Sequence, residues 1–517
     1  MSENTKKSFS ATFFRSAMIV VVLLGAALFL RSLNMNKILS GDETILMDIS
    51  GSKFAKIVPA LKNEEVYPPL TFILLHYWMH VSRAIVWVRL YFVLFGLGCC
   101  FLIYFLGKEY LGVKLARISL LLSVLSPLLI FSSQYVRSYI DSAFLMLLST
   151  LFMLKIIKGK QELINWIVYV VSAVLSLYTF YFSFLLIFCQ FIFILIFKWK
   201  EKRFILTWCL ALIIVGLIFL PWVPSAIGQF KNASSVVYDW SDKGFNLGVF
   251  RFGLYTRNIF SLFGFDPYFM VFRGGISMYF SKIILGFVVI SSILGFSYFF
   301  YLCFSYLKSK LQNDRALLWF FFFLTFSPLA LSWLLAGLLN TMPNARYLVS
   351  LHALFLILVS IFLCSLLERK HLAGIIFTFL VLIIFALRIP DTVCSEFEID
   401  KAVSFLKKEL DQNGCLICIY SCPPEATLAA IIKVGDDLTL NENGSRYIVK
   451  SSDFDSKLKQ RLSAFKKVYF YRVCGSAEIF GANDLLDGLI IKEGFKNSKI
   501  VKFKNIDIVE YKKKDAK

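Results

Sequence analysis

Charge is scarce in this 517-residue chain, in which 17% of the residues are charged, 58% are hydrophobic and 17% are aromatic. In soluble globular domains about a quarter of the residues are charged, so the composition excludes an ordinary soluble protein and indicates a polytopic membrane protein. The apolar runs also lack the strict alternation that a lipid-exposed barrel requires, which favours membrane-spanning helices. No small-residue cleavage site follows the first apolar run, residues 16–33, so we expect this run to be retained as a helix.

Acidic residues are fewer than basic ones: 34 Asp and Glu stand against 55 Lys and Arg, which gives a formal net charge of +21. The basic residues cluster in short loops between apolar runs, as the positive-inside rule requires, so the excess predicts membrane topology and no nucleic-acid partner. Lys6, Lys7 and Arg15 precede the first run and predict a cytoplasmic N-terminus.

About eleven apolar runs of roughly 17–25 residues are long enough to cross a bilayer. The fifth and sixth are expected to form a hairpin around residues 178–182. Two long loops, 31–82 and 222–280, are predicted on the outer side, and the first contains stretches expected to form interfacial helices. An odd number of spans puts the rest of the chain outside, in a multi-pass protein of a bacterial or archaeal cell membrane.

The composition changes to a soluble type near residue 388. Helices are expected at 399–410 and 425–434, and strands at 415–420, 467–473 and 500–511. Helices that alternate with strands predict a small α/β domain. The sequence therefore predicts an all-α transmembrane catalytic domain over 1–388 and an extracytoplasmic α/β domain over 389–517.

Polar residues capable of chemistry are few, and they lie at the ends of spans on the side opposite the basic loops. Asp42 and Glu43 follow the first span. A partly desolvated carboxylate beside a second one has a raised pKa, which suits a general base that takes a proton from a hydroxyl. The alternative interpretation of this pair is a solvated loop start or a helix N-cap.

Two prolines divide the first outer loop, where Tyr67 precedes Pro68 and Pro69 and a helix is excluded before Leu70. His76 and His80 follow with the i,i+4 spacing of a metal pair. No third ligand is near in sequence, so an interface helix face is favoured and no metal is predicted.

The remaining candidates are charged and polar residues at the outer ends of later spans. Arg89 lies in the second span and should face the protein interior or a partner, because an unpaired charge in lipid is costly. Gln134, Arg137, Tyr139 and Asp141 lie at the start of the fourth span. Arg137 and Asp141 are one helical turn apart and are expected to be able to pair, whereas the functional interpretation is that Arg137 holds a phosphate in its planar fork.

Arg346 lies at the predicted outer start of the tenth span. A lone arginine there could simply extend its guanidinium to the interface. Two interior-facing arginines on one side of the membrane, together with an acidic pair, favour catalysis on a lipid phosphate.

Taken in order, these residues resemble the GT-C glycosyltransferases. An acidic pair after the first span, then Pro68-Pro69-Leu70 and an arginine-bearing second span, is similar to the glycosyltransferase family 39-like enzymes, namely protein O-mannosyltransferases and bacterial aminoarabinose transferases that modify lipid A. Residues 134–139 and the Arg-Tyr-Leu of 346–348 resemble two later segments of these enzymes. The chain departs from the pattern at Tyr67, where the lipid A enzymes carry a lysine, and the loop before helix eight is too short for the β-trefoil insert of the eukaryotic enzymes.

The resemblance implies a sugar donor carried on a polyprenyl phosphate in the outer leaflet, and a lipid, glycan or protein acceptor. The roles that it implies are Asp42 as catalytic base with Glu43 as the fallback, Arg137 and Arg346 as donor-phosphate ligands supported by Tyr139 and Arg89, and Tyr67, His76, Gln134 and Asp141 as substrate-binding residues. In-line attack with inversion needs neither a metal nor a cofactor.

Two other functions remain open on the sequence alone. A transporter or flippase for lipid-linked saccharides would share the outward charges, although transporters usually place their sites near the bilayer midplane and show internal repeats, which this chain lacks. A ligase that moves a whole glycan from a lipid carrier is the third possibility.

Overall fold

The computed structural model describes residues 3–37, 39, 41–230, 315–338, 345–369, 371–393, 405, 408, 414–418, 467–473, 490–492, 494–503 and 506–513. The chain divides into two compact units, each described by itself: residues 1–35 with 53–393, and residues 36–52 with 394–517. The predicted eighth span and the helix expected at 425–434 lie outside the described residues.

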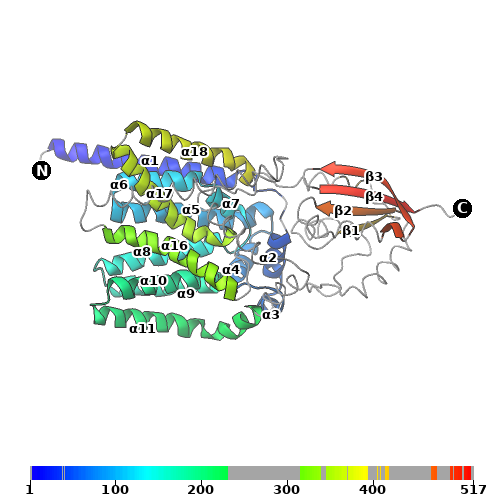
Figure 1. The fold of residues 1–517 in the computed structure, drawn as a ribbon, viewed down its shortest axis with the longest axis horizontal. Coiled ribbons are helices and arrows are strands. Elements are labelled where there is room, and N and C mark those ends of the chain that lie inside the picture. The colour runs from blue at the N-terminus through cyan, green and yellow to red at the C-terminus, as the bar shows by residue number, and fades with distance from the viewer. Residues whose placement is uncertain are drawn as a thin grey trace. The chain divides into compact units, whose positions relative to one another are not determined.

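The first unit is a bundle of helices. Its described elements are α1 (Glu3–Ser32), α3 (Phe54–Glu64), α4 (Leu70–Met79), α5 (Ile85–Leu111), α6 (Val113–Leu125), α7 (Pro127–Gln134), α8 (Ile140–Ile157), α9 (Leu163–Thr179), α10 (Ser183–Phe197), α11 (Lys202–Phe219), η1 (Leu220–Trp222), α16 (Arg315–Leu338), η2 (Ala345–Leu348), α17 (Val349–Arg369) and α18 (His371–Val393). The long helices lie side by side, whereas the short helices α3, α4 and α7 gather toward one end of the bundle (Figure 1).

Five of the described helices are long and apolar enough to cross a membrane, and the bent pair α6 and α7 counts as a sixth if it is one span. Shorter apolar helices include α9 and α10, of 17 and 15 residues. These two form the predicted hairpin, since α9 ends at Thr179 and α10 begins at Ser183. The total of about eleven spans stays a prediction.

The third predicted span is bent by 54° between α6 and α7. Pro127 opens α7, where its missing N–H costs nothing, and Ser126 caps the helix by accepting from the Leu129 N–H. The Ser126 hydroxyl also shares a 2.6 Å hydrogen bond with Nε2 of His352 on α17. The bend is therefore fixed by a proline, a cap and a contact from a distant helix.

Arg31, at the end of α1, is fully buried beside this bend. Its Nη2 and Nη1 donate to the carbonyls of Ser123 and Val124 at 2.9 and 3.4 Å. Its Nε donates to the Ser133 hydroxyl at 3.2 Å. A helix that breaks leaves carbonyls without an intrahelical partner, so the guanidinium replaces the hydrogen bonds that the bend removes.

The second unit contains α2 (Gly41–Gly51) and a four-stranded sheet of order β1-β2-β4-β3. Its strands are β1 (Gly414–Cys418), β2 (Lys467–Val473), β3 (Phe495–Phe503) and β4 (Ile506–Lys513). β1 and β2 pair in parallel and the other pairs are antiparallel. The first two strands were predicted, but the single strand expected over 500–511 is wrong, because a hairpin between Phe503 and Ile506 divides it.

A close approach between α5 and α7 requires glycine at position 96. A Cβ on Gly96 would lie 2.8 Å from Cβ of Ser133 and 3.3 Å from Nε of Arg31. We expect Gly96→Ala to destabilise the bundle by about 1–3 kcal/mol through overpacking. Thermal unfolding in detergent measures the loss, with Gly216→Ala on α11 as control because no atom lies within 4 Å of the new methyl group. Equal melting temperatures for the two variants would contradict this packing.

Candidate functional site

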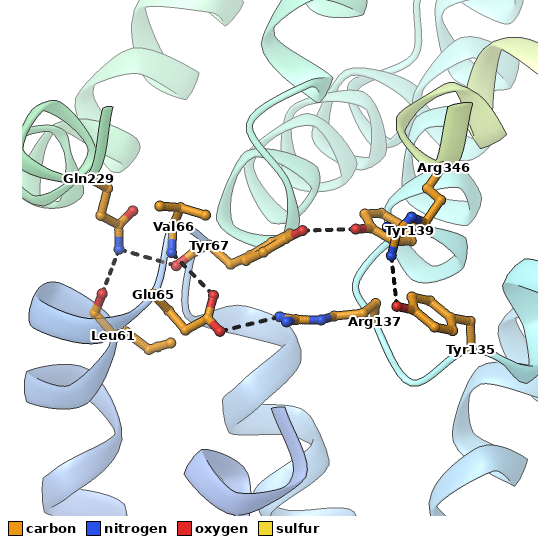
Figure 2. Close-up of polar contacts among 9 residues, drawn as sticks. All are labelled: Leu61, Glu65, Val66, Tyr67, Tyr135, Arg137, Tyr139, Gln229 and Arg346. Carbon is orange, nitrogen blue, oxygen red and sulfur yellow. Dashed lines mark hydrogen bonds and ion pairs between the residues drawn. The ribbon is translucent and has the colours of Figure 1, made fainter. Parts of the chain in front are cut away.

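Three connecting segments meet at one end of the helical bundle. They are the linker 65–69 between α3 and α4, the turn 135–139 between α7 and α8, and η2 before α17. The prolines at 68 and 69 keep the linker out of the helix, and Glu65 is extended with φ −125° and ψ 162°. Figure 2 shows side chains from these segments facing one another.

Arg137 is the most buried charge of this cluster, with 1% of its surface exposed. Its Nη1 lies 3.5 Å from Oε1 of Glu65, which is 3% exposed (Figure 2). Its guanidinium also lies over the Tyr67 ring, 4.9 Å from the ring centroid. The charge is therefore held by an ion pair and a cation–π contact, both from the linker.

The sequence interpretation did not single out Glu65. The signal that could have found it is its position two residues before the Tyr-Pro-Pro segment, where the prolines favour the end of a helix.

Tyrosines connect the two predicted phosphate-binding arginines. The hydroxyls of Tyr67 and Tyr139 are 2.8 Å apart, and Tyr139 stacks on Tyr135 with ring centroids at 6.2 Å. The Tyr135 hydroxyl accepts a 2.7 Å hydrogen bond from Nη1 of the half-buried Arg346 (Figure 2). Arg137 and Arg346, far apart in the sequence, thus belong to one cluster.

Tyr67 stays a neutral phenol in this cluster. Burial raises its pKa well above the usual range, and the neighbouring Tyr139 and Tyr347 raise it further, against the opposing effect of Arg137. The ring also stacks on Phe180, with centroids 6.0 Å apart. Arg137 and Arg346 therefore lie against neutral aromatic rings, and Glu65 supplies a carboxylate beside Arg137.

The predicted pairing of Arg137 with Asp141 is wrong. α8 begins at Ile140, so Arg137 lies in the preceding turn and not one helical turn away on the same helix. Asp141 instead accepts from the Thr71 hydroxyl at 2.7 Å and from the Ser142 N–H at 2.9 Å. Its buried carboxylate fastens α4 to α8.

Arg89 and Gln134 hold backbone segments together. Arg89 is fully buried, which confirms that it faces the interior. Its Nε donates to the Gln134 carbonyl at 3.1 Å and its Nη1 to the Met35 carbonyl at 2.8 Å. The Gln134 amide donates in turn to the carbonyls of Leu33 and Arg31. These contacts fix the end of α7, from which the turn 135–139 starts.

A second polar group that the sequence did not indicate supports the linker from the helical segment 223–230, which follows η1. The buried Gln229 donates to the Leu61 carbonyl at 2.7 Å and to the Tyr67 carbonyl at 3.5 Å (Figure 2). Its own carbonyl oxygen accepts from the Tyr181 hydroxyl, which accepts from the indole N–H of Trp222. Burial raises the pKa of Tyr181 to about 12, so it remains a hydrogen-bond donor.

The other predicted site residues lie on α2 and α4. Asp42 is half-buried and Glu43 buried in the first turn of α2, and burial raises the pKa of Asp48 on the same helix. Because α2 belongs to the second unit, the catalytic role of the acidic pair stays a prediction. His76 packs against Phe54 and His80.

Among the residues that the structure describes, no three or more metal-ligating side chains gather into a possible metal site.

No protein-family model matches the sequence, and no curated protein matches it. The similarity to solved structures shows that the chain has the GT-C fold, as the sequence resemblance implied. It is similar to ArnT from Cupriavidus metallidurans in the apo state, with a TM-score of 0.56 and 13% identity over 97% of this chain and 98% of that one. ArnT bound to undecaprenyl phosphate gives a TM-score of 0.54 at 13% identity, over 95% and 97%.

The hydrogen bond from Thr71 to Asp141 should contribute to the stability of the site. Thr71→Val removes the donor while keeping the shape, and we expect a loss of about 1–3 kcal/mol because a buried carboxylate oxygen loses its partner. Thermal unfolding measures it. Thr378→Val is the control, since the Thr378 hydroxyl donates only within its own helix, to the Gly374 carbonyl. If both variants melt like the wild type, the contact does not stabilise the bundle.

Proposed function

We propose that the protein is a membrane glycosyltransferase, which moves a sugar from a polyprenyl-phosphate donor to an acceptor hydroxyl on the extracytoplasmic face. The observation that carries the proposal is the meeting of Arg137 and Arg346 in one cluster at the end of a GT-C bundle. Guanidinium groups match phosphate oxygens in charge and geometry. The structure of ArnT bound to undecaprenyl phosphate supports a lipid-phosphate donor.

The burial of each side chain suggests how the roles divide. Arg346 is half-buried, so it is suited to contact the donor phosphate first, whereas Arg137 lies deeper against Glu65 and Tyr67. Arg89 donates to backbone carbonyls, so we assign it a positioning role. Tyr139 stands between the two phosphate ligands and keeps their spacing.

The proposed reaction is a single inverting displacement. Asp42 takes the proton from the acceptor hydroxyl, with Glu43 as the alternative base, and the acceptor oxygen attacks the anomeric carbon. The bond between that carbon and the phosphate oxygen breaks, and polyprenyl phosphate leaves with the electron pair. Arg137 and Arg346 stabilise the negative charge that develops on the leaving phosphate.

The phosphate role of Arg346 is tested by Arg346→Gln in the full chain purified in detergent. Loss of one charge-assisted contact should weaken the binding of undecaprenyl phosphate by about 10- to 100-fold. Isothermal titration or native mass spectrometry measures the dissociation constant. Arg203→Gln, which removes an exposed charge at the start of α11, should leave affinity unchanged. Equal affinities for wild type and Arg346→Gln would exclude this residue as a ligand.

The base role of Asp42 is tested by Asp42→Asn. Transfer should fall by about 100-fold or more, because the amide cannot accept the proton, while undecaprenyl phosphate still binds. Turnover is followed as release of undecaprenyl phosphate from a panel of undecaprenyl-phosphate-linked hexoses and aminopentoses. If wild-type protein in vesicles moved the labelled donor across the bilayer, and Asp42→Asn moved it equally fast, the protein would be a transporter. This outcome would contradict the enzyme.

A further inference from the structure

The deeper of the two proposed phosphate ligands already has a counter-ion. Arg137 and Glu65 are 1% and 3% exposed, and their charged atoms lie 3.5 Å apart. A buried charge without a partner is strongly destabilising, so Glu65 makes it possible to keep a guanidinium at this depth. A phosphate that binds Arg137 must therefore compete with the Glu65 carboxylate.

The contact between the two groups is looser than a strong charge-assisted hydrogen bond. Such bonds between a cationic N–H and a carboxylate are about 2.7–2.9 Å long, compared with 3.5 Å here. The adjacent Ser138 is fully buried, and its hydroxyl has no hydrogen-bond partner among the described residues. A buried hydroxyl without a partner is costly, and a ligand that brings an acceptor oxygen would remove that cost.

We propose that Glu65 is an exchangeable counter-ion of Arg137, which the donor phosphate displaces on binding and which returns when the lipid phosphate leaves. Glu65 is thus a positioning residue that sets the affinity of the site for lipid phosphate. The inference rests on the proposed function, because it assumes that the ligand is a polyprenyl phosphate.

This exchange has a consequence for product release. The donor is a phosphodiester with one negative charge, whereas the leaving polyprenyl phosphate is a monoester with a charge between about −1.5 and −2 near neutral pH. Two arginines alone would bind the product more tightly than the donor. A carboxylate that competes for Arg137 weakens product binding, and release of product limits the rate of many enzymes.

The test compares Glu65→Gln and Glu65→Asp with wild type, using the full chain in detergent and undecaprenyl phosphate as the ligand. Glu65→Gln should lower the melting temperature of the free protein, because Arg137 loses its counter-ion. The same variant should bind undecaprenyl phosphate about tenfold more tightly, and its ligand-induced rise in melting temperature should be larger. Glu65→Asp, whose shorter side chain weakens the pair, should shift affinity in the same direction by less.

Two controls separate competition from a general effect of charge. Glu162→Gln removes an exposed carboxylate just before α9 and should leave affinity unchanged. In an Arg137→Gln background, Glu65→Gln should give no further gain in affinity, because the group under competition is absent. Together these variants attribute the gain to the Glu65–Arg137 pair.

The outcomes are distinct. If Glu65→Gln and Glu65→Asp bind as weakly as wild type or more weakly, Glu65 is a structural partner only and the inference is overturned. If Glu65→Gln fails to fold, the affinity of Glu65→Asp decides. If the wild type itself does not bind undecaprenyl phosphate, the proposed function fails first.

Discussion

Buried guanidinium groups are the constraint on which the described bundle depends. Arg31, Arg89 and Arg137 are each at most 1% exposed, although an uncompensated charge in such a setting is costly. Arg31 and Arg89 donate mainly to backbone carbonyls at helix ends, whereas Arg137 pairs with Glu65. The first two guanidinium groups therefore hold helix ends together, whereas the third is paired with a carboxylate side chain.

Irregular backbone is what brings the site together. The linker 65–69 and the turn 135–139 are not helical, and each is fastened at its base by buried polar contacts from Gln229 and Gln134. Side chains on rigid supports keep their spacing without further ordering, which favours the binding of a charged group. The bend between α6 and α7 also positions the site, because it fixes the direction in which α7 leads into the turn 135–139.

The sequence predicted the features that depend on local rules, including membrane helices, the hairpin between α9 and α10, and strands β1 and β2. It also predicted that Arg89 faces inward, because the cost of charge in lipid allows few alternatives. It did not predict Glu65 or Gln229, whose partners are distant in sequence. The pairing of Arg137 with Asp141 was wrong because it assumed that both residues lie on one helix. The helix α8 begins at Ile140, three residues after Arg137. Spacing rules apply only within a correctly bounded element.

The aromatic character of the cluster follows from the same electrostatic constraint. Tyr67 lies with its ring centroid 4.9 Å from the Arg137 guanidinium. A second cation at that distance would repel the first in a buried setting, and one carboxylate, Glu65, could not neutralise both. A neutral phenol instead attracts the guanidinium through its ring, and its hydroxyl shares a hydrogen bond with the Tyr139 hydroxyl. Tyr67 and Glu65 are therefore a matched pair: the tyrosine adds no charge, so a single exchangeable carboxylate is enough to balance Arg137.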